Sequence, residues 1–371
     1  MKILFLSSFG LPNGRIEKSA LTATKNGYEV IFAGRGSSTY KNFMFSRMYS
    51  ISWNAKARFG IPYYWHNVRK QIRKVIEDVR PDIIHAHTIF PAKMINDLGI
   101  PFIYDDNEHW AQHAKILYEI SSSRSSSKIG RWLTKQMKKR AISLWPLWEK
   151  EVVSNHPTIT VSDHLAADLN KIGNTKDVFV VPNFPLESEI KNINYPIYNN
   201  EINSVYEGRD GIAIDAHPHR NLEGLEDIFL ENDIGNLIFI GWKEKNKEKI
   251  FFKGLLPRNL MFTEMTKYDI GLIPWKKHWS HPYLNPNKYA EYAHSGLLVI
   301  NTSSLETISN TLQGRNEITE NYDDLVTKLS YYKENINDLY KKRIETYNFA
   351  KKNLLWDNYE KNILHAYQIC Q

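Results

Sequence analysis

The residues best suited to hold a nucleotide lie together in one segment of the second half of the chain. Pro286 and Asn287 precede Lys288, and the pattern after them predicts a helix that carries Glu291 and ends at Gly296. Lys288 could contact a diphosphate, and Glu291, about one turn further on, could accept both hydroxyl groups of a ribose. The same spacing also fits an exposed Lys–Glu pair on a helix surface, so spacing alone leaves both interpretations open.

A second candidate is the first loop, which precedes a helix predicted over 15–26. Asn13 and Gly14 form a turn signal, and the helix N-terminus behind them could hold an anion. Arg15 would add a bidentate donor to a phosphate or carboxylate. A plain turn followed by a surface arginine is the simpler alternative. The loop lacks G-x-G-x-x-G, so a dinucleotide site is not predicted.

Two further groups of polar side chains follow predicted strands. His85 and His87 share one face of a strand. Acidic partners at matching spacing are missing, so no metal site is predicted, and His87, nearer the strand end, is the better ligand-facing candidate. The segment 105–109, with Glu108 and His109, could bind sugar hydroxyls, act as a base or hold a divalent ion. A charged loop that caps a helix is the alternative.

Short apolar runs alternate with helical patterns, which predicts parallel sheets buried between helices. A length of 371 residues favours two domains. The first half is expected to contain strands at 2–8, 28–34, 82–88, 101–106, 158–162 and 178–182. The second half is expected to contain strands at 211–216, 237–242, 250–254, 269–275 and 297–302. The rhythm breaks at 184–208, which is predicted to be a linker between domains at 1–183 and 209–345, followed by a closing helical segment at 346–371.

This pattern predicts an α/β fold with two doubly wound, Rossmann-like domains. Ligands of such sheets bind beyond the carboxyl ends of the strands. The candidate residues above lie at such ends, as does Arg220 in the segment 217–220. We therefore expect one site in a cleft between the two domains, while the fold alone does not define the activity.

Positive charge is concentrated in the first half of the chain. Segments 41–80 and 111–150 each carry nine Lys and Arg against two acidic residues, in a chain of net charge +7. Such patches attract membrane surfaces, phosphorylated lipids or nucleic acids. No base-stacking or groove-reading motif accompanies the charge, so nucleic acid is not an expected partner. Segment 129–145 has the basic amphipathic pattern of an interfacial helix, and core packing with a solvated basic face is the alternative.

Other features narrow the class of protein. No apolar run reaches the roughly 18–20 residues of a membrane-spanning helix, and the short apolar N-terminus fits a strand better than a signal peptide. The single cysteine, Cys370, excludes a disulfide framework and cysteine-ligated zinc. We expect a cytoplasmic protein that binds peripherally to the membrane rather than inserting into it.

Segment 286–300 resembles the donor-binding signature of glycosyltransferase family 4, whose members have the GT-B fold. That signature typically reads P-x-K-x-x-E-[YA]-x-A-x-G-x-P-V-[VI], and the chain has PNKYAEYAHSGLLVI. Other segments resemble further elements of the family in the same order, namely PNGRIEKSALTATKNGYEVIFAG, PDIIHAHT, PFIYDDNEHW, TITVSDHLAADL with VFVVPNFP, and the closing NFAKKNLLWDNYEKNILHAY. The resemblance covers nearly the whole chain.

The chain departs from the family pattern at three places. Many members have a Glu-x7-Glu pair, of which Glu291 matches the second position while Tyr283 stands at the first. Asn107 replaces the usual His of the Y-D-x-H-E element, and His109 follows two residues later. Arg220 matches the Lys of an Arg…Lys pair that usually opens the second domain, and we expect no Arg at the upstream position of this pair.

The resemblance implies a nucleotide-sugar-dependent glycosyltransferase whose C-terminal helix crosses back to the first domain. It further implies a retaining transfer without essential metal or cofactor, from a UDP- or GDP-sugar. The expected donor-binding residues are Asn13, Gly14, Arg15, Arg220, Asn287, Lys288 and Glu291, and the catalytic candidates on the acceptor side are His87, Glu108 and His109.

The acceptor implied by this family is a glycan or a lipid-linked sugar, as in polysaccharide or glycoconjugate assembly. The two basic segments favour an acceptor at an anionic membrane surface. Two alternatives remain open. One is a noncatalytic GT-B partner subunit, which the residues at 107 and 283 favour, and the other is a nucleotide-sugar epimerase or hydrolase on the same fold.

Overall fold

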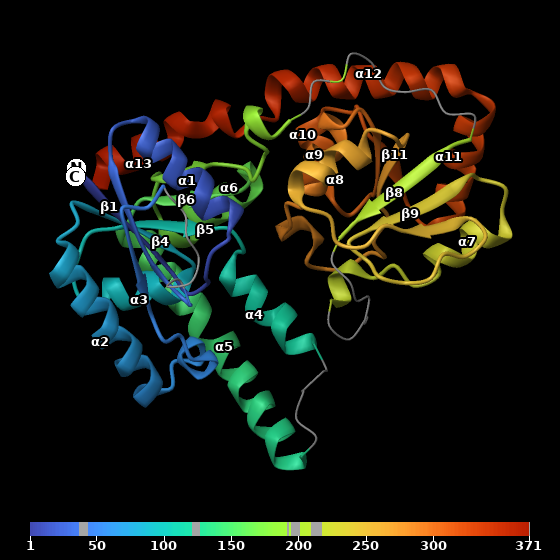
Figure 1. Cartoon of the computed structure of the whole chain (residues 1–371). Helices are drawn as coiled ribbons and strands as arrows, with labels where there is room; N and C mark the ends of the chain where they lie inside the picture. Colours follow the sequence, from blue (N-terminus) through green and yellow to red (C-terminus); the bar gives the residue numbers. More distant parts are fainter. Residues whose placement is uncertain (37–43, 121–126, 191–192, 194–200, 209–216, 371) are drawn as a thin grey trace. The chain divides into compact units, whose positions relative to one another are not determined.

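The chain folds into two compact units (Figure 1). The computed structural model describes residues 1–36, 44–120, 127–190, 193, 201–208 and 217–370. Each unit contains a parallel sheet flanked by helices, which confirms the predicted α/β class. Unit 1 comprises Met1–Glu119, Ser123–Asn183 and Tyr359–Gln371, and unit 2 comprises Ile120–Ser122 and Phe184–Asn358.

The described strands of unit 1 form a parallel sheet in the order β3-β2-β1-β4-β5-β6-β7. Its central strands are apolar and buried, as expected for a sheet covered on both faces. The strand order reverses between β1 and β4, where Ser7 lies opposite His87. The strands are β1 (Lys2–Ser7), β2 (Glu29–Gly34), β3 (Arg47–Ser50), β4 (Ile83–His87), β5 (Ile103–Asp106), β6 (Thr158–Thr160) and β7 (Val178–Val180).

The C-terminal helix packs on unit 1, as predicted from the family resemblance. Asn362 Nδ2 donates a hydrogen bond to the carbonyl of Val180 at 2.8 Å, and Glu360 accepts one from Thr22 at 3.0 Å. The helices of unit 1 are α1 (Gly14–Lys25), η2 (Ala55–Phe59), α2 (Pro62–Val79), α3 (Ile89–Asn96), α4 (Trp110–Glu119), α5 (Lys128–Asn155), α6 (Asp163–Gly173) and α13 (Glu360–Cys370).

The described strands of unit 2 form a second parallel sheet, in the order β10-β9-β8-β11-β12-β13. Here the order reverses between β8 and β11. The strands are β8 (Asn203–Glu207), β9 (Asn236–Ile240), β10 (Ile250–Phe252), β11 (Ile270–Ile273), β12 (Leu298–Thr302) and β13 (Glu317–Thr319). The helices are η3 (Glu187–Glu189), η4 (Pro218–Arg220), α7 (Leu225–Glu231), α8 (Arg258–Met265), η5 (His281–Tyr283), α9 (Lys288–His294), α10 (Glu306–Leu312), α11 (Tyr322–Glu334) and α12 (Ile336–Asn353), with η6 (Trp356–Tyr359) at the boundary to unit 1.

The start of the second sheet differs from the prediction. Strand β8 is central in this sheet and lies at 203–207, inside the predicted linker 184–208, so that part of the linker prediction is wrong. Its sequence NSVYE has only two apolar side chains, which hid it among polar neighbours. The predicted strand 211–216 lies outside the described residues. In the sequence, Arg209 stands two positions after Glu207, the last residue of β8, so an arginine does stand upstream of Arg220, contrary to the expectation from the family pattern.

The C-terminal region is not one continuous helical segment. Helices α11 and α12 meet at Asn335, and α12 ends before Leu354. Trp356 then donates its backbone N–H to the carbonyl of Pro185 at 2.9 Å. All of α12 belongs to unit 2, and only the chain from Tyr359 onward belongs to unit 1. The predicted boundary at residue 346 thus falls inside a helix.

Helix α5 combines core packing with an exposed N-terminal half. Ala141 and Trp145 are buried, whereas Ile129, Trp132 and Leu133 are 73%, 59% and 49% exposed. Figure 1 shows this exposed half running beside α4, away from the sheet of unit 1. Core packing is therefore confirmed for the C-terminal half, and the exposed N-terminal half leaves the interfacial interpretation as a prediction. Within the described part of the chain, no helix is long and apolar enough to cross a membrane.

Candidate active site

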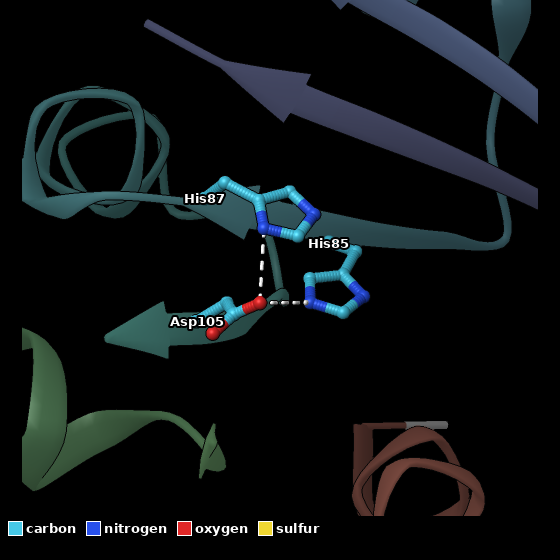
Figure 2. Close-up of side chains that lie close together, drawn as sticks. All are labelled: His85, His87 and Asp105. Atoms are coloured by element: carbon cyan, nitrogen blue, oxygen red, sulfur yellow. Dashed lines mark ion pairs between the residues drawn. The ribbon is translucent and has the colours of Figure 1, made fainter. Parts of the chain in front are cut away.

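The carboxyl ends of β4 and β5 carry a buried network centred on Asp105. Arg15 Nε donates to both carboxylate oxygens of Asp105, at 2.7 and 2.9 Å. His87 Nδ1 and His85 Nε2 lie 2.9 and 3.4 Å from Asp105 Oδ2 (Figure 2). The other nitrogen of His85 lies 2.9 Å from the hydroxyl of Tyr367 in α13. The network thus joins two strands of the sheet to the first and last helices of unit 1.

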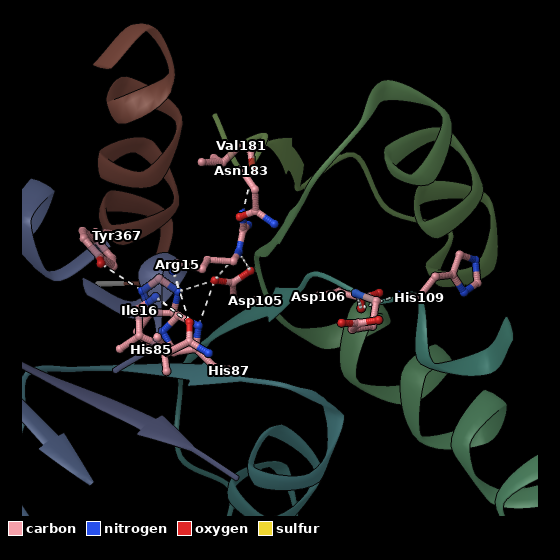
Figure 3. A network of polar contacts seen from close by, with 12 residues as sticks. Arg15, Ile16, His85, His87, Asp105, Asp106, His109, Val181, Asn183 and Tyr367 are labelled. Atoms are coloured by element: carbon pink, nitrogen blue, oxygen red, sulfur yellow. Dashed lines mark hydrogen bonds and ion pairs between the residues drawn. The ribbon is translucent and has the colours of Figure 1, made fainter. Parts of the chain in front are cut away.

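Arg15 occupies a fixed position because the start of α1 is well anchored. Asn13 caps the helix, and its Oδ1 accepts hydrogen bonds from the N–H groups of Arg15 and Ile16 at 3.1 and 3.2 Å. Arg15 Nη1 donates to the carbonyl of Val181 and to Asn183 Oδ1, both at 2.8 Å (Figure 3). The side chain is buried, in contrast to the surface arginine of the simpler alternative.

Arg15 also sets the charge balance of this network. Burial alone would raise the pKa of Asp105, but the guanidinium of Arg15 and then His87 outweigh burial, so the pKa lies well below its usual value. Burial, followed by the charge of His87, lowers the pKa of His85 to about 4. At neutral pH the network therefore contains a charged Arg15–Asp105 pair and a neutral His85 ring.

The side chains of His85, His87 and Asp105 are also close enough to be considered as metal ligands, because one ligand atom of each lies within 4.8 Å of the others. Imidazole and carboxylate groups are the usual ligands of zinc in mixed sites. However, both oxygens of Asp105 already accept hydrogen bonds from Arg15. A divalent ion there would lie beside a buried guanidinium, so these residues fit a metal-free ion-pair network better.

His109 lies in a separate cluster at the start of α4. Its Nε2 is 2.6 Å from Asp168 Oδ2, its Nδ1 is 3.3 Å from Glu149 Oε2, and its backbone N–H donates to Asp106 at 2.9 Å. The side chain is fully buried. Burial alone would lower the pKa of His109, but Glu149, Asp106 and Asp168 raise it to about 9. His109 is therefore a charged residue whose two ring nitrogens both face carboxylates.

This cluster positions α4. The buried carboxylate of Glu149, on α5, accepts hydrogen bonds from the backbone N–H groups of Trp110 and Ala111 at 2.6 and 3.1 Å. It thereby satisfies donors that the first turn of a helix leaves unpaired. Glu108 is exposed, and its carboxylate lies 3.5 Å from His113. Of the two residues predicted here, only Glu108 presents its side chain to solvent.

In unit 2, Lys288 lies where the strand order reverses. It is the first residue of α9, which follows β11, and its Nζ lies 3.2 Å from Oε2 of Glu207, the last residue of β8. The ion pair therefore spans the switch point, where open α/β sheets bind their ligands. Burial alone would lower the pKa of Lys288, but the charge of Glu207, with smaller contributions from Tyr206 and Glu291, outweighs burial, so the pKa is raised.

Glu291 lies one turn along α9 and is held by a neighbouring arginine. Its Oε1 is 2.7 Å from Nη1 of Arg258, which also pairs with Glu189. Burial and then the charge of Glu207 raise the pKa of Glu291, while Arg258 and Lys288 oppose them. Three carboxylates and two cations thus share this part of unit 2.

Two other predicted donor residues, Arg220 and Asn287, belong to unit 2 and lie close to Lys288. Arg220 is in η4, and its charge acts on the pKa of Lys288, which places both cations in one electrostatic environment. Its guanidinium carbon is 5.7 Å from the ring centre of Trp275. The side chain of Asn287 makes no capping hydrogen bond to α9. Tyr283, at the position of the missing Glu, is in η5.

Sequence reasoning identified several of these residues but not their partners. Glu207 is 81 residues from Lys288, and Asp168 is 59 residues from His109, so no local spacing connects them. Arg258 opens a helix in the middle of unit 2 and matches no motif. The partners missed were Glu149, Asp168, Glu207, Arg258 and Tyr367.

Residues 20–184 match the model of Glycosyltransferase Family 4. Comparison with solved structures finds sucrose-phosphate synthase from Thermosynechococcus elongatus at 11% identity and a TM-score of 0.73, covering 100% of this chain and 99% of that chain. HepE from Anabaena in complex with UDP-glucose has 13% identity and a TM-score of 0.66, with 100% of both chains covered. WaaG, a glycosyltransferase involved in lipopolysaccharide biosynthesis, has 12% identity and a TM-score of 0.61, with 97% and 98% covered.

A search of curated proteins by sequence gives no match. The structural neighbours confirm the predicted GT-B fold, and the family model confirms the similarity to glycosyltransferase family 4 over residues 20–184.

Proposed function

We propose that this GT-B chain is a glycosyltransferase that moves a sugar from a nucleotide-sugar donor to a glycan or lipid-linked acceptor. The observation that carries the proposal is the Lys288–Glu207 pair across the switch point of unit 2, with Glu291 one turn along the same helix. HepE and an alpha-glucosyltransferase among the structural neighbours were solved with UDP or UDP-glucose, which supports a UDP-sugar as the donor here.

Lys288 and Arg220 would neutralise the diphosphate as it leaves. In the transfer, the bond between the anomeric carbon and the diphosphate oxygen breaks, and its electron pair stays on the diphosphate. An acceptor hydroxyl forms the new bond to that carbon on the same face, and its proton passes to the departing phosphate. Fixed cations at the developing negative charge would lower the barrier without a metal ion. Asn287, whose side chain caps nothing, is free to donate to the same phosphates.

Glu291 would bind the ribose. One of its oxygens pairs with Arg258, so the carboxylate is held in a fixed orientation while accepting hydroxyl groups. In unit 1, the Asn13–Gly14 turn is the part of the predicted donor contact that remains accessible, because a Cβ on Gly14 would meet no atom within 4 Å. Arg15, being committed to Asp105, would act by positioning this turn.

On the acceptor side, the exposed Glu108 and the ring of His87 are the proposed contacts. His87 Nε2 is buried and has no hydrogen-bond partner among the described residues, so a hydroxyl could satisfy it. His109 does not replace the histidine missing at Asn107, because both of its ring nitrogens already face carboxylates. This arrangement keeps a noncatalytic donor-binding subunit as the second candidate.

The exposed half of α5 supports peripheral binding to an anionic membrane. Trp132 and Leu133 are exposed within a segment rich in lysine and arginine, as in helices that lie in the lipid interface. Wild-type protein should bind phosphatidylglycerol vesicles at low salt and release them at high salt. Changing Trp132 and Leu133 to Ser should weaken binding, whereas changing the exposed Leu255 of unit 2 to Ser should not. Equal binding to neutral phosphatidylcholine vesicles would contradict this part of the proposal.

A thermal-shift screen against UDP-, GDP-, ADP- and CMP-sugars tests the central proposal. A ligand at about 100 times its Kd stabilises the folded protein by roughly 2.7 kcal/mol. One donor should raise the melting temperature of the wild type and of Lys245→Ala, an exposed control. Lys288→Ala and Glu291→Ala should abolish the shift.

Two outcomes decide between the candidates. Donor binding followed by sugar release to an added acceptor supports the transferase, and donor binding without turnover in any acceptor mixture supports the noncatalytic subunit. A wild-type protein that binds none of the nucleotide-sugars would refute both.

A further inference from the structure

Arg58 is half-buried and lacks the kind of partner that three other arginines of the chain have. Arg15, Arg258 and Arg343 each pair with at least one carboxylate. No carboxylate within the described residues lies within 4.0 Å of Arg58. The residues of unit 1 outside the described part of the chain, 37–43, 123–126 and 371, include no Asp or Glu. The charge of Arg58 is thus uncompensated by its own unit.

The backbone around Arg58 is fixed by α5. Arg58 belongs to η2, and its carbonyl accepts a hydrogen bond from Trp145 Nε1 at 2.8 Å. Arg140 Nε donates to the carbonyl of the next residue, Phe59, at 2.7 Å. After Phe59, Gly60 turns the chain with a φ of 65°, close to Trp148. The short helix is therefore anchored at its C-terminal end.

The guanidinium is also held in one place. Its Nη2 donates to the carbonyl of Ser8 at 3.2 Å, and its central carbon lies 4.9 Å from the ring centre of Phe9 and 5.5 Å from that of Phe90. These contacts use one of its five N–H groups and two aromatic faces. The remaining donors have no partner within the described part of unit 1.

This position is the switch point of the first sheet. Ser8 follows β1 and Thr88 follows β4, and their hydroxyl oxygens lie 3.1 Å apart. The strand order reverses between these two strands, so ligands are expected in the crevice there. Arg58 is thus bonded to the backbone at the place where the topology predicts a ligand.

A second cation lies beside it. Arg35 follows β2, and its backbone N–H donates to the carbonyl of Phe9 at 3.1 Å, in the same loop that Arg58 contacts. Burial lowers the pKa of Arg58, and the charge of Arg35 lowers it further. Two like charges beside one loop destabilise each other unless an anion lies between or beside them.

We propose that Arg58, assisted by Arg35, binds a phosphate group of the acceptor at the switch point of unit 1. The anion site itself follows from the uncompensated, pre-oriented guanidinium, which is suited to bidentate binding of such groups. Its assignment to the acceptor rests on the proposed glycosyltransferase function. The acceptor class would then be a sugar phosphate or a phosphate-bearing lipid rather than a neutral glycan.

Glucose 6-phosphate and phosphatidylglycerol vesicles are the probes, with glucose and phosphatidylcholine vesicles as the neutral counterparts. Binding is measured by titration calorimetry for the sugars and by co-sedimentation for the vesicles, in the absence of any nucleotide-sugar. Arg58→Met should weaken binding of the charged probe about 10- to 100-fold, the factor for a lost hydrogen bond to a charged group. Arg69→Met, which removes an arginine of the same unit that is paired with Asp97, is the matched control.

The stability of Arg58→Met gives a second readout. A purely structural arginine would lower the melting temperature when removed. An arginine kept for binding would leave it unchanged or raise it, because a desolvated, unpaired charge is removed. Arg58→Lys, which keeps the charge but not the planar fork, should fall between wild type and Arg58→Met in affinity.

The outcomes are distinguishable from those of the nucleotide-sugar screen. Weaker binding of glucose 6-phosphate by Arg58→Met alone supports a soluble phosphorylated acceptor, and weaker binding of the anionic vesicles alone supports a lipid phosphate. Equal binding by wild type and Arg58→Met, or no binding of either charged probe by wild type, overturns the inference even if a nucleotide-sugar binds at Lys288. If no nucleotide-sugar binds to the wild type, the proposed function is refuted. The binding of glucose 6-phosphate and anionic vesicles then still decides whether Arg58 is an anion site.

Discussion

Replacing Asp105 by Asn should strongly destabilise unit 1. The Asp105 side chain is 1% exposed and accepts two hydrogen bonds from Arg15 Nε, at 2.7 and 2.9 Å, with His87 Nδ1 at 2.9 Å. Asn keeps the size of the side chain but removes its charge. Arg15, itself buried, would then be an uncompensated cation. Breaking a buried pair in this way typically costs about 3–5 kcal/mol.

Calorimetry of the two-unit chain can measure this loss. For a domain of about 150–250 residues, 1 kcal/mol shifts the melting temperature by about 2–4 °C. The transition of unit 1 should therefore move down by roughly 6–20 °C. Arg47→Gln is the control, because Arg47 and Asp78 are exposed and 3.8 Å apart, and such pairs contribute at most about 1 kcal/mol.

A double-mutant cycle separates the pair from the rest of the network. Arg15→Met combined with Asp105→Asn removes both charges, so the double variant should be clearly more stable than the sum of the single losses implies. Additive losses, or a loss below about 1 kcal/mol for Asp105→Asn, would refute the reasoning that Arg15 depends on this carboxylate.

Three further predictions use the same chain. The pKa of His109 is raised to about 9, so its contribution to stability is fully present below the unfolded-state pKa near 6.5 and is lost as pH rises through 9. Urea unfolding at a series of pH values should show this loss in wild type and not in His109→Gln. The same pH dependence of the free energy of unfolding in both proteins would contradict the prediction. The pKa of His85 is lowered to about 4, so its contribution to stability is present above about pH 6.5 and is lost as pH falls through 4. His85→Gln should therefore lose less free energy of unfolding than wild type as the pH falls. An equal loss in the two proteins would exclude His85 as a cause. Arg343 Nη1 lies 2.6 Å from the buried Asp269, so Arg343→Met should lower the stability of unit 2 by about 3–5 kcal/mol, and a calorimetric shift confined to unit 1 would disprove it.

The fold was predictable because parallel strands that are buried on both faces consist mostly of apolar residues, as in β1 and β4. Strand β8 was not, since NSVYE is half polar although it lies in the middle of its sheet. Strand β3, at the edge, has the half-polar sequence RMYS and was missed for the same reason. Apolar content therefore fails to identify a short, half-polar strand even in the middle of a sheet.

The candidate site divides in a similar way. Lys288 and Glu291 could be placed together from sequence because one helical turn separates them. Their partners could not, since Glu207 and Arg258 reach the same point through sheet topology rather than through spacing. The Asp105–Arg15 pair joins residues 90 positions apart. Sequence therefore indicated which residue types could do the chemistry, and the strand order decided which of them meet.

The ion pairs at the two switch points differ in how deeply they are buried. In unit 1, the side chains of Arg15 and Asp105 are 5% and 1% exposed and are bonded on several sides, so this pair is a rigid support. In unit 2, the side chains of Lys288 and Glu207 are 13% and 22% exposed and make a single contact with each other. A partly solvated ion pair is weaker than a fully buried one, so under the proposed function Lys288 would exchange Glu207 for a diphosphate at a modest cost in free energy. Unit 1 instead offers Arg58, a cation with no carboxylate to release among the described residues. Under the proposed function, Lys288 would be a displaceable cation for the leaving diphosphate, and Arg58 would be a permanent positive charge for the acceptor.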